Sequence, residues 1–163
     1  MMELRGLTDA AGRRFAIVVS EFNAEVTSGL LEGARQTLAA ARVSEADVTV
    51  VHVPGAFEIP LAAMRLAETG RFAAVICLGC LIKGETMHFE YIAEAAAHGI
   101  MEASAVTGVP ITFGVLTTLT DEQALARAGS GPDNKGRDAA LAAIAMATLL
   151  PQIDERPGGD GAV

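Results

Sequence analysis

The hydrophobic and polar positions divide the chain into two kinds of segment. Short, continuous apolar runs of strand length lie at residues 14–20, 47–53, 72–82 and 111–118. Longer segments with apolar residues at helical spacing lie at residues 24–41, 57–70, 88–108, 120–129 and 134–150. Strands that alternate with helices and are apolar on both faces are typical of a parallel sheet covered on both sides. The pattern predicts an α/β fold, a three-layer sandwich whose four-stranded parallel sheet has helices on both faces.

Turn and cap residues mark the ends of these segments. Thr120 is expected to cap the short helix after the fourth strand, because acidic residues follow it in the first turn. The helix over 88–108 is expected to end or bend near Gly99. We expect residues 1–150 to form one domain, because neither a linker nor an internal repeat interrupts them. Residues 151–163 end in a stretch rich in Gly, Pro and charge, and are expected to form a flexible C-terminal tail.

Composition narrows the class of protein. Hydrophobic residues make up 51% of the 163-residue chain, which is too many for a disordered protein. The apolar runs are too short to cross a bilayer, and the N-terminal segment MMELRGLTDA lacks the apolar region of a secretory signal. No membrane partner is therefore expected, and the expected location is cytoplasmic. The formal net charge of −8 would repel a phosphate backbone, which argues against nucleic acid as the main partner.

The two cysteines, Cys77 and Cys80, lie within the third apolar run. Two thiols do not complete a four-cysteine zinc site, and the chain has no second pair. A redox pair would be expected at the start of a helix rather than inside a strand. A spacing of three in a strand points the two side chains to opposite faces. We therefore expect two reduced, buried cysteines and no metal site.

Polar residues follow each of the predicted strands. The segments concerned are Glu21-Phe22-Asn23, Pro54 to Glu58, Lys83 to His88, and Thr117-Thr118. In open parallel sheets, ligands bind outside the carboxyl ends of the strands, near a reversal in strand order. These segments are therefore expected to gather at one edge of the sheet and to form the binding site.

The segment from Lys83 to His88 is densely polar and has two interpretations. A helix beginning near Thr86 would offer free backbone N–H groups and its positive dipole end to a phosphate, and Gly84 would let the chain approach closely. An ordinary solvated turn with Thr86 as helix N-cap explains the same residues. His88, in the first turn, could carry protons near neutral pH or be a lone surface histidine.

Basic and aromatic residues elsewhere are compatible with the same kind of ligand. Arg127, Lys135 and Arg137 surround the loop before the last helix, where a solvated helix start explains them equally well. The Gly-x-x-x-x-Gly-Lys-Ser/Thr order of a Walker loop is absent. Phe22 could stack on a flat heterocycle or pack in the core. The residues favour a phosphorylated small molecule, and chemistry by positioning and proton transfer rather than by a covalent nucleophile.

Six segments in the same order resemble one family, the 6,7-dimethyl-8-ribityllumazine synthases of riboflavin biosynthesis. They are SEFNAEVTSGLLEGA, VPGAFEIPLAA, LGCLIKGETMHFEYIAEAAAHGI, GVPITFGVLTT, EQALARAG and NKGRDAALAAI, and they cover about residues 14–150. The resemblance implies a flavodoxin-like fold and a transferase that condenses 5-amino-6-(D-ribitylamino)uracil with 3,4-dihydroxy-2-butanone 4-phosphate. Imine formation, phosphate loss and ring closure would give the lumazine, in the penultimate step of the pathway, with no cofactor and no metal.

The resemblance also implies roles for individual residues. The residues implied to bind substrates are Phe22, Asn23, Ala56, Phe57, Glu58, Cys80, Leu81, Ile82, Glu85, Thr86, Phe113, Arg127 and Lys135. Phe22 would stack on the pyrimidine, Glu58 would bind ribityl hydroxyls, and the backbone of residues 80–82 would meet the uracil edge. Backbone N–H groups of residues 85–86 would receive the phosphate. His88 would be the catalytic residue that transfers protons.

Part of this site is implied to come from a neighbouring copy of the chain. Phe113 would approach the heterocycle, Arg127 the phosphate and Lys135 a uracil carbonyl, with the acidic Asp138 nearby. A homopentamer or a higher assembly of pentamers follows from sites shared in this way. The alanine-rich last helix is compatible with close packing between subunits, although such helices also occur within monomers.

Two segments depart from the family pattern. KGET replaces the commoner RGET, so Lys83 keeps the charge but loses the planar fork of arginine. GSGPDNKG replaces the GTKAGN pattern of members that close into sixty-subunit shells, and Pro132 and Asp133 could alter the turn. A bare pentamer, a pair of pentamers and a shell stay open.

Two other functions on the same fold also stay open. One is a noncatalytic scaffold that binds flavin or lumazine or forms a shell, and the other is a related enzyme that dismutates lumazines. The presence of His88, Arg127 and Lys135 counts against a scaffold, which needs none of them. The segments GETMHF and VPGAFEIP favour the synthase over the dismutating enzyme.

Overall fold

The core of the fold is a sheet of four parallel strands. The structure, a computed structural model, describes residues 1–155 of the chain. Its strands are β1 (Phe15–Ser20), β2 (Val48–Val53), β3 (Ala74–Ile82) and β4 (Ile111–Thr118). They lie in the order β2-β1-β3-β4, and each neighbouring pair is parallel. The predicted four-stranded parallel sheet is confirmed.

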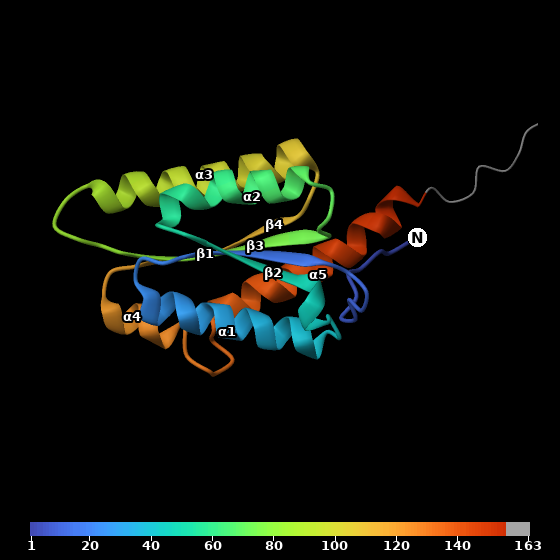
Figure 1. Ribbon diagram of the computed structural model, residues 1–163, viewed down its shortest axis with the longest axis horizontal. Coiled ribbons are helices and arrows are strands. Elements are labelled where there is room, and N and C mark those ends of the chain that lie inside the picture. The colour runs from blue at the N-terminus through green and yellow to red at the C-terminus, as the bar shows by residue number, and fades with distance from the viewer. Residues whose placement is uncertain (156–163) are drawn as a thin grey trace, which may run out of the picture.

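Helices cover both faces of this sheet (Figure 1). They are α1 (Ala24–Ala40), α2 (Ile59–Glu68), α3 (His88–Thr107), α4 (Asp121–Ala126) and α5 (Lys135–Asp154), with the 3-10 turns η1 (Glu45–Asp47) and η2 (Ala56–Glu58). Helices α2 and α3 lie on one face, and α1, α4 and α5 lie on the other (Figure 1). The predicted three-layer α/β sandwich is therefore confirmed.

Each face of the sheet buries its own apolar core. Ile17 and Leu78 belong to the core beneath α1 and α5, whereas Val18 and Val75 belong to the core beneath α2 and α3. Successive residues of a strand point to opposite faces, and here both faces are removed from water. This double burial is why the strands are continuous apolar runs in the sequence.

The strand order reverses beside β1. From β1 the chain moves outward to β2, crosses back to β3 on the other side of β1, and continues to β4. The helix that follows β1 lies on one face of the sheet, and the helix that follows β3 lies on the other (Figure 1). The connections leave the sheet in opposite directions, so a crevice opens at the carboxyl ends of β1 and β3.

Helix α3 continues through Gly99, contrary to the expectation that it would end or bend there. A Cβ at Gly99 would lie 2.8 Å from Pro60 Cβ, which is closer than side-chain packing allows. Gly99 therefore serves the close approach of α3 to α2, and its lack of a side chain does not mark a helix end. The predicted cap of α4 is confirmed, because the Thr120 hydroxyl accepts a hydrogen bond from the Gln123 N–H at 3.2 Å.

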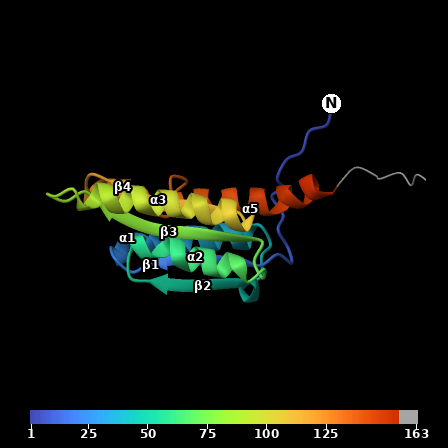
Figure 2. The ribbon, with the colours of Figure 1, turned by 90° about the horizontal axis from the view of Figure 1, so that it is seen from above.

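The last helix is longer than the sequence pattern predicted. Helix α5 continues through Pro151 to Asp154, so the first residues of the expected tail are helical. The Gln152 side chain donates hydrogen bonds to the carbonyls of Thr148 (2.9 Å) and Arg5 (2.8 Å). These contacts hold the last turns of α5 against the N-terminal segment (Figure 2). Residues 156–163, the remainder of the expected tail, lie outside the described residues.

The small side chains of α5 have a use within the chain. Four of its alanines, Ala139, Ala140, Ala143 and Ala147, are buried and belong to the core that α5 shares with α1 and the sheet. Their small size therefore brings α5 close to elements of the same chain. For these four alanines, packing within the chain replaces the suggested packing between subunits.

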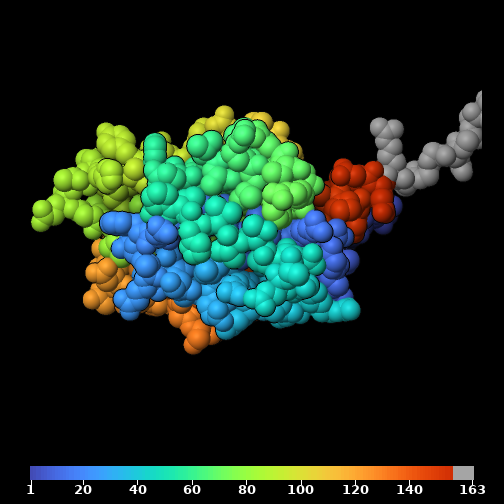
Figure 3. Space-filling view, viewed as in Figure 1, coloured from blue at the N-terminus to red at the C-terminus, as the bar shows by residue number. Residues whose placement is uncertain are grey.

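The segment between β3 and α3 projects from the rest of the molecule (Figures 1 and 3). Its residues from Lys83 to His88 are all exposed. Within residues 1–155, no helix is both long enough and apolar enough to span a bilayer.

Candidate functional site

The crevice at the carboxyl ends of β1 and β3 contains a cavity of about 540 Å³. Most of the residues predicted to bind substrate line this cavity. They are Phe22, Asn23, Ala56, Phe57, Glu58, Cys80, Leu81, Ile82 and Thr86, together with His88. The strands thus bring together residues from three separate parts of the sequence, as expected for a reversal in strand order.

Asn23 closes the end of β1 against β3. Its backbone is left-handed (φ 60°), a conformation that Asn tolerates better than most residues. Its side-chain amide donates a hydrogen bond to the Cys80 carbonyl at 2.9 Å. The preceding residues are fixed too, because the N–H groups of Glu21 and Phe22 donate to the carbonyls of Val53 (2.8 Å) and Pro54 (3.1 Å).

Two phenylalanine rings are exposed at the cavity wall. Phe22 is 70% exposed and Phe57 is 59% exposed, although aromatic side chains normally contribute to cores. The backbone hydrogen bonds on either side of Phe22 hold it there rather than letting the ring turn inward. Two exposed rings beside one cavity are suited to a flat ligand. The alternative sequence interpretation of Phe22, core packing, is wrong for the chain in isolation.

The turn η2 places the Glu58 carboxylate near the cavity. A Cβ at Gly55 would lie 3.1 Å from Glu58 Oε2, so the carboxylate lies close over the Gly55 backbone. Ala56, between them, is buried. This turn therefore presents one acceptor group, Glu58, and one apolar group, Phe57, to the cavity.

The segment between β3 and α3 offers free backbone donors. Helix α3 begins at His88, and Met87 is its N-cap residue without a side-chain cap bond. This start agrees with the helix predicted over residues 88–108, and Thr86 is not its N-cap residue. Its hydroxyl lies 3.5 Å from the His88 nitrogen, at the limit of a hydrogen bond. Among residues 1–155, no hydrogen-bond acceptor is paired with the N–H of Glu85 or Thr86.

Lys83 is paired rather than free at the start of this segment. Its ammonium lies 2.8 Å from Glu90 Oε1, and its N–H donates to the Thr118 carbonyl at 2.9 Å. The hydrogen bond from Lys83, followed by a backbone hydrogen bond, lowers the pKa of the Glu90 carboxyl. The pair ties the beginning of the segment to the first turn of α3. Glu85 lies between these ends but lines neither this cavity nor the one described next.

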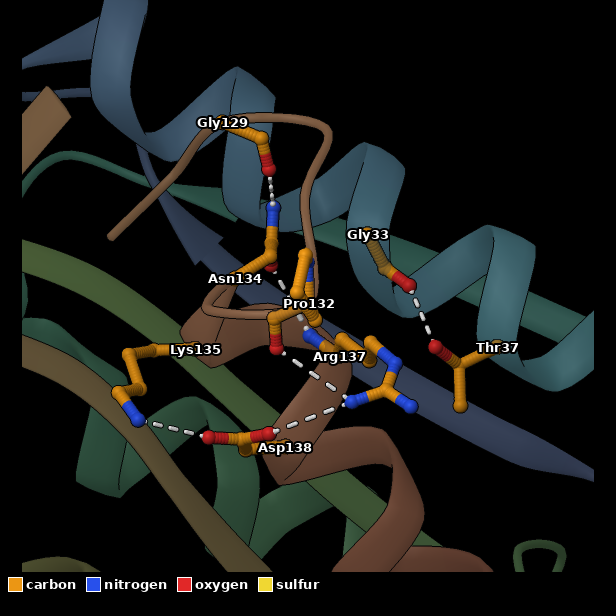
Figure 4. Close-up of polar contacts among 8 residues, drawn as sticks. All are labelled: Gly33, Thr37, Gly129, Pro132, Asn134, Lys135, Arg137 and Asp138. Carbon is orange, nitrogen blue, oxygen red and sulfur yellow. Dashed lines mark hydrogen bonds and ion pairs between the residues drawn. The ribbon is translucent and has the colours of Figure 1, made fainter. Parts of the chain in front are cut away.

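The other predicted residues line a second cavity of about 370 Å³, beside β4 and α5. Phe113, Arg127 and Lys135 lie there with Asp138. The Arg127 guanidinium donates to the Gln123 carbonyl at 2.9 Å. The Lys135 ammonium lies 2.8 Å from Asp138 Oδ2, and Figure 4 shows this pair beside Arg137.

The two cavities have no lining residue in common. A single chain therefore gathers the aromatic, backbone and histidine groups in one place and the two cations in another. Strand β4, which carries Phe113, is an edge of the sheet.

The buried cysteines do not supply a nucleophile. Cys77 and Cys80 are both free and belong to different cores, as their spacing predicted. Burial, and to a smaller extent the charge of Asp121, raises the pKa of the Cys80 thiol to about 11. The thiol is therefore protonated near neutral pH, and the thiolate is the reactive form. Within residues 1–155, no cluster of His, Cys, Asp and Glu side chains is grouped to hold a metal ion.

Asn134 is a candidate that the sequence pattern alone does not mark as functional. This side chain is buried between α1 and α5, and it directly precedes Lys135, which lines the second cavity. The available signal was a short polar residue directly before a helix, which is typical of an N-cap. That signal identifies Asn134 only as a helix cap. It does not reveal the hydrogen bond to Gly29 of α1, because the two residues are far apart in the sequence.

Comparison with known proteins identifies the family of the chain. Residues 12–151 match the sequence profile of the 6,7-dimethyl-8-ribityllumazine synthase family. The chain is 52% identical over 149 residues to 6,7-dimethyl-8-ribityllumazine synthase 1 of Caulobacter vibrioides, covering 91% of this chain and 97% of that protein. It is 54% identical to the 6,7-dimethyl-8-ribityllumazine synthases of Salinibacter ruber, over 88% of this chain and 92% of the relative, and of Syntrophus aciditrophicus, over 88% and 94%. The chain belongs to the 6,7-dimethyl-8-ribityllumazine synthase family.

Proposed function

We propose that the protein condenses 5-amino-6-(D-ribitylamino)uracil with 3,4-dihydroxy-2-butanone 4-phosphate. The products are 6,7-dimethyl-8-ribityllumazine, inorganic phosphate and water, and the reaction is the penultimate step of riboflavin biosynthesis. Family membership over residues 12–151 carries this proposal. The cavity supports it, because it combines exposed aromatic rings, free backbone donors and an imidazole.

The pyrimidine binds in the crevice cavity. Phe22 stacks on its ring, which removes an exposed aromatic face from water. The backbone of residues 80–82 hydrogen-bonds the uracil edge, and Asn23 supports it because its amide already holds the Cys80 carbonyl. Glu58 accepts hydrogen bonds from the ribityl hydroxyls, and Ala56 and Phe57 complete the wall.

The phosphate of the second substrate binds at the start of α3. The backbone N–H groups of Glu85 and Thr86 have no partner in the described chain, and the positive end of the α3 dipole lies beside them. Arg127 of a neighbouring copy adds a guanidinium, which suits a phosphate better than a point charge does. Glu85 as a whole lines neither cavity, and its free N–H is the group through which it would reach the phosphate.

His88 transfers protons during imine formation and phosphate elimination. It is exposed at the first residue of α3 and lines the crevice cavity beside Thr86. An imidazole changes protonation near neutral pH more readily than other side chains do. Much of the rate comes from holding the two substrates together, so His88 assists a reaction that positioning already favours.

The working unit is a homopentamer or an assembly of pentamers in the cytoplasm. The two separate cavities support this proposal, because Phe113, Arg127 and Lys135 line a cavity other than the crevice and a second copy of the chain could bring them to it. The exposed apolar side chains of α3 also support it: Tyr91 is 69%, Met101 is 73% and Val106 is 66% exposed. Apolar groups gathered on one helix are typical of an interaction surface.

A mixing experiment tests the shared site. His88→Ala and Arg127→Ala chains are unfolded together and allowed to reassemble. Random assortment gives roughly a quarter of the sites an intact His88 from one chain and an intact Arg127 from the other. With the phosphorylated substrate held below its KM, so that the loss of Arg127 lowers the rate, activity well above that of either variant alone is expected. A mixture no more active than the mean of its components would contradict a site shared between chains.

The reaction itself is tested with purified protein and both substrates. Phosphate release and lumazine fluorescence are followed together, and the two products are expected in equal amounts. Omission of either substrate should abolish both signals. If neither product forms while a pyrimidine or flavin still binds, the protein is a noncatalytic binding or scaffold protein.

A further inference from the structure

Asn134 is a buried amide that joins three segments of the chain. It is 3% exposed and precedes α5. Its Oδ1 accepts from the Arg137 N–H at 3.0 Å, which caps α5. Its Nδ2 donates to the Gly129 carbonyl at 2.8 Å and to the Gly29 carbonyl of α1 at 3.0 Å. We call this group of four residues the Asn134 joint; Figure 4 shows the part formed by Gly129, Asn134 and Arg137.

Glycines make room for the joint. A Cβ on Gly33 of α1 would collide with the Asn134 carboxamide, and a Cβ on Gly136 of α5 would collide with the Leu30 carbonyl. A Cβ on Gly29 would collide with the Ala128 carbonyl. The two helices and the loop thus approach each other closely at this point. An amide packed in this way has little freedom to change its hydrogen bonds.

The joint is connected directly to the two cations of the second cavity. Lys135 follows Asn134 in the chain, and its N–H donates to the Arg127 carbonyl at 2.8 Å. The loop held by Asn134 therefore starts at Arg127 and ends at Lys135. Both side chains line the same cavity. A shift of this loop against α1 would move the backbone from which each cation extends.

We propose that Asn134 is a positioning residue that holds Arg127 and Lys135 in place for the substrates. This inference rests on the proposed function, because it assigns Arg127 to the phosphate. Only an amide makes all three contacts of the joint. A serine could cap α5 but is too short to reach Gly29, and a carboxylate could cap α5 but would face two carbonyl oxygens.

Asn134→Asp and Asn134→Ser test the inference in the full-length assembled protein. The KM for 3,4-dihydroxy-2-butanone 4-phosphate is expected to rise about tenfold, the size of losing buried hydrogen bonds, while kcat changes far less. If Asn134→Asp does not fold, Asn134→Ser provides the test, because serine buries no charge. Unchanged KM in a folded variant would overturn the inference.

Thr148→Val is the matched control on the same helix. Thr148 is buried, and its hydroxyl accepts from the Leu7 N–H at 2.7 Å and donates to the Ile144 carbonyl at 2.9 Å. It lines neither cavity of the site. The control should lower the melting temperature but leave KM unchanged. If it raises KM as much as the Asn134 variants do, loss of stability explains the effect and the positioning role is wrong.

A double-mutant cycle shows whether Asn134 acts through Arg127. In an Arg127→Ala background, the KM effect of the Asn134 variants should nearly disappear. An undiminished effect would overturn action through Arg127. The KM ratio of Asn134→Asp to wild type should also fall as the pH is lowered, because a protonated carboxyl regains one donor.

The wild-type protein separates the two proposals. Absence of turnover by wild type overturns the proposed function and, with it, this inference. Turnover by wild type together with an unchanged KM in the Asn134 variants overturns this inference alone.

Discussion

Two regions proposed to hold the phosphate are built in opposite ways. The segment from Lys83 to His88 projects from the molecule, all its residues are exposed, and the N–H groups of Glu85 and Thr86 are unpaired within the described chain. The loop from Arg127 to Lys135 is fixed by the Asn134 joint, where each hydrogen bond is made within the chain. One region keeps its donors free for a ligand, and the other uses its donors to place two cations. The difference shows how one ligand can be bound by two kinds of loop. The exposed loop offers unpaired N–H groups, and the fixed loop holds the positive charges of Arg127 and Lys135 in place.

The largest expected effect is a loss of stability when a substitution disrupts the packing of the rigid region. Gly136→Val forces a side chain against the Leu30 carbonyl and should destabilise the protein by about 3 kcal/mol. Gly84→Ala, in the exposed segment, meets no atom within 4 Å and should change the free energy of unfolding by less than about 0.5 kcal/mol. Urea unfolding measures both. Equal losses of stability would remove the contrast between the two regions.

Removal of the His88 imidazole tests whether the exposed region transfers protons during the reaction. His88→Ala should lower kcat by about 100-fold without abolishing turnover, because general acid–base catalysis contributes on this scale and positioning remains. The pH–rate profile of the variant should flatten near neutral pH. His98→Ala, exposed on the same helix and outside both cavities, is the control. A wild-type rate and profile for His88→Ala would exclude proton transfer by this residue.

Removal of the Arg127 guanidinium tests whether the rigid region binds the phosphate. Arg127→Ala should raise the KM for the phosphorylated substrate by about tenfold or more, the size of a charge-assisted contact, and leave the KM for the pyrimidine nearly unchanged. Steady-state kinetics with each substrate varied in turn separates the two constants. An equal rise in both would show that Arg127 supports the site generally and does not bind the phosphate.

The smallest expected effect concerns the ion pair between Lys83 and Glu90, at the start of the exposed segment. Lys83 lowers the pKa of Glu90 from its ordinary value of 4.5, so the ionised pair stabilises the folded state above that pH. The stabilisation is lost as the pH falls through the lowered pKa. Glu90→Gln should therefore melt slightly below wild type at neutral pH, and the gap should close below about pH 4.5. A gap that is constant with pH would exclude the charge of Glu90 as its cause.

The sequence analysis located the strands and helices well because their apolar periodicity is a local property. One local signal can nevertheless have two physical uses, and the sequence does not choose between them. Gly99 was expected to end a helix, but it lets α3 approach Pro60. Thr86 was considered as a cap, but α3 begins two residues later. The alanines of α5 were considered for contacts between subunits, but four of them pack within the chain.

The sequence by itself determined the layered fold, the family and the residues proposed for the site, because periodicity and segment order are written along the chain. Only the tertiary structure decided that those residues occupy two separate cavities and that Asn134 joins α1 to α5. The physical reason is distance in the sequence. The Asn134–Gly29 hydrogen bond joins residues 105 positions apart, and whether such groups meet depends on how closely the helices pack.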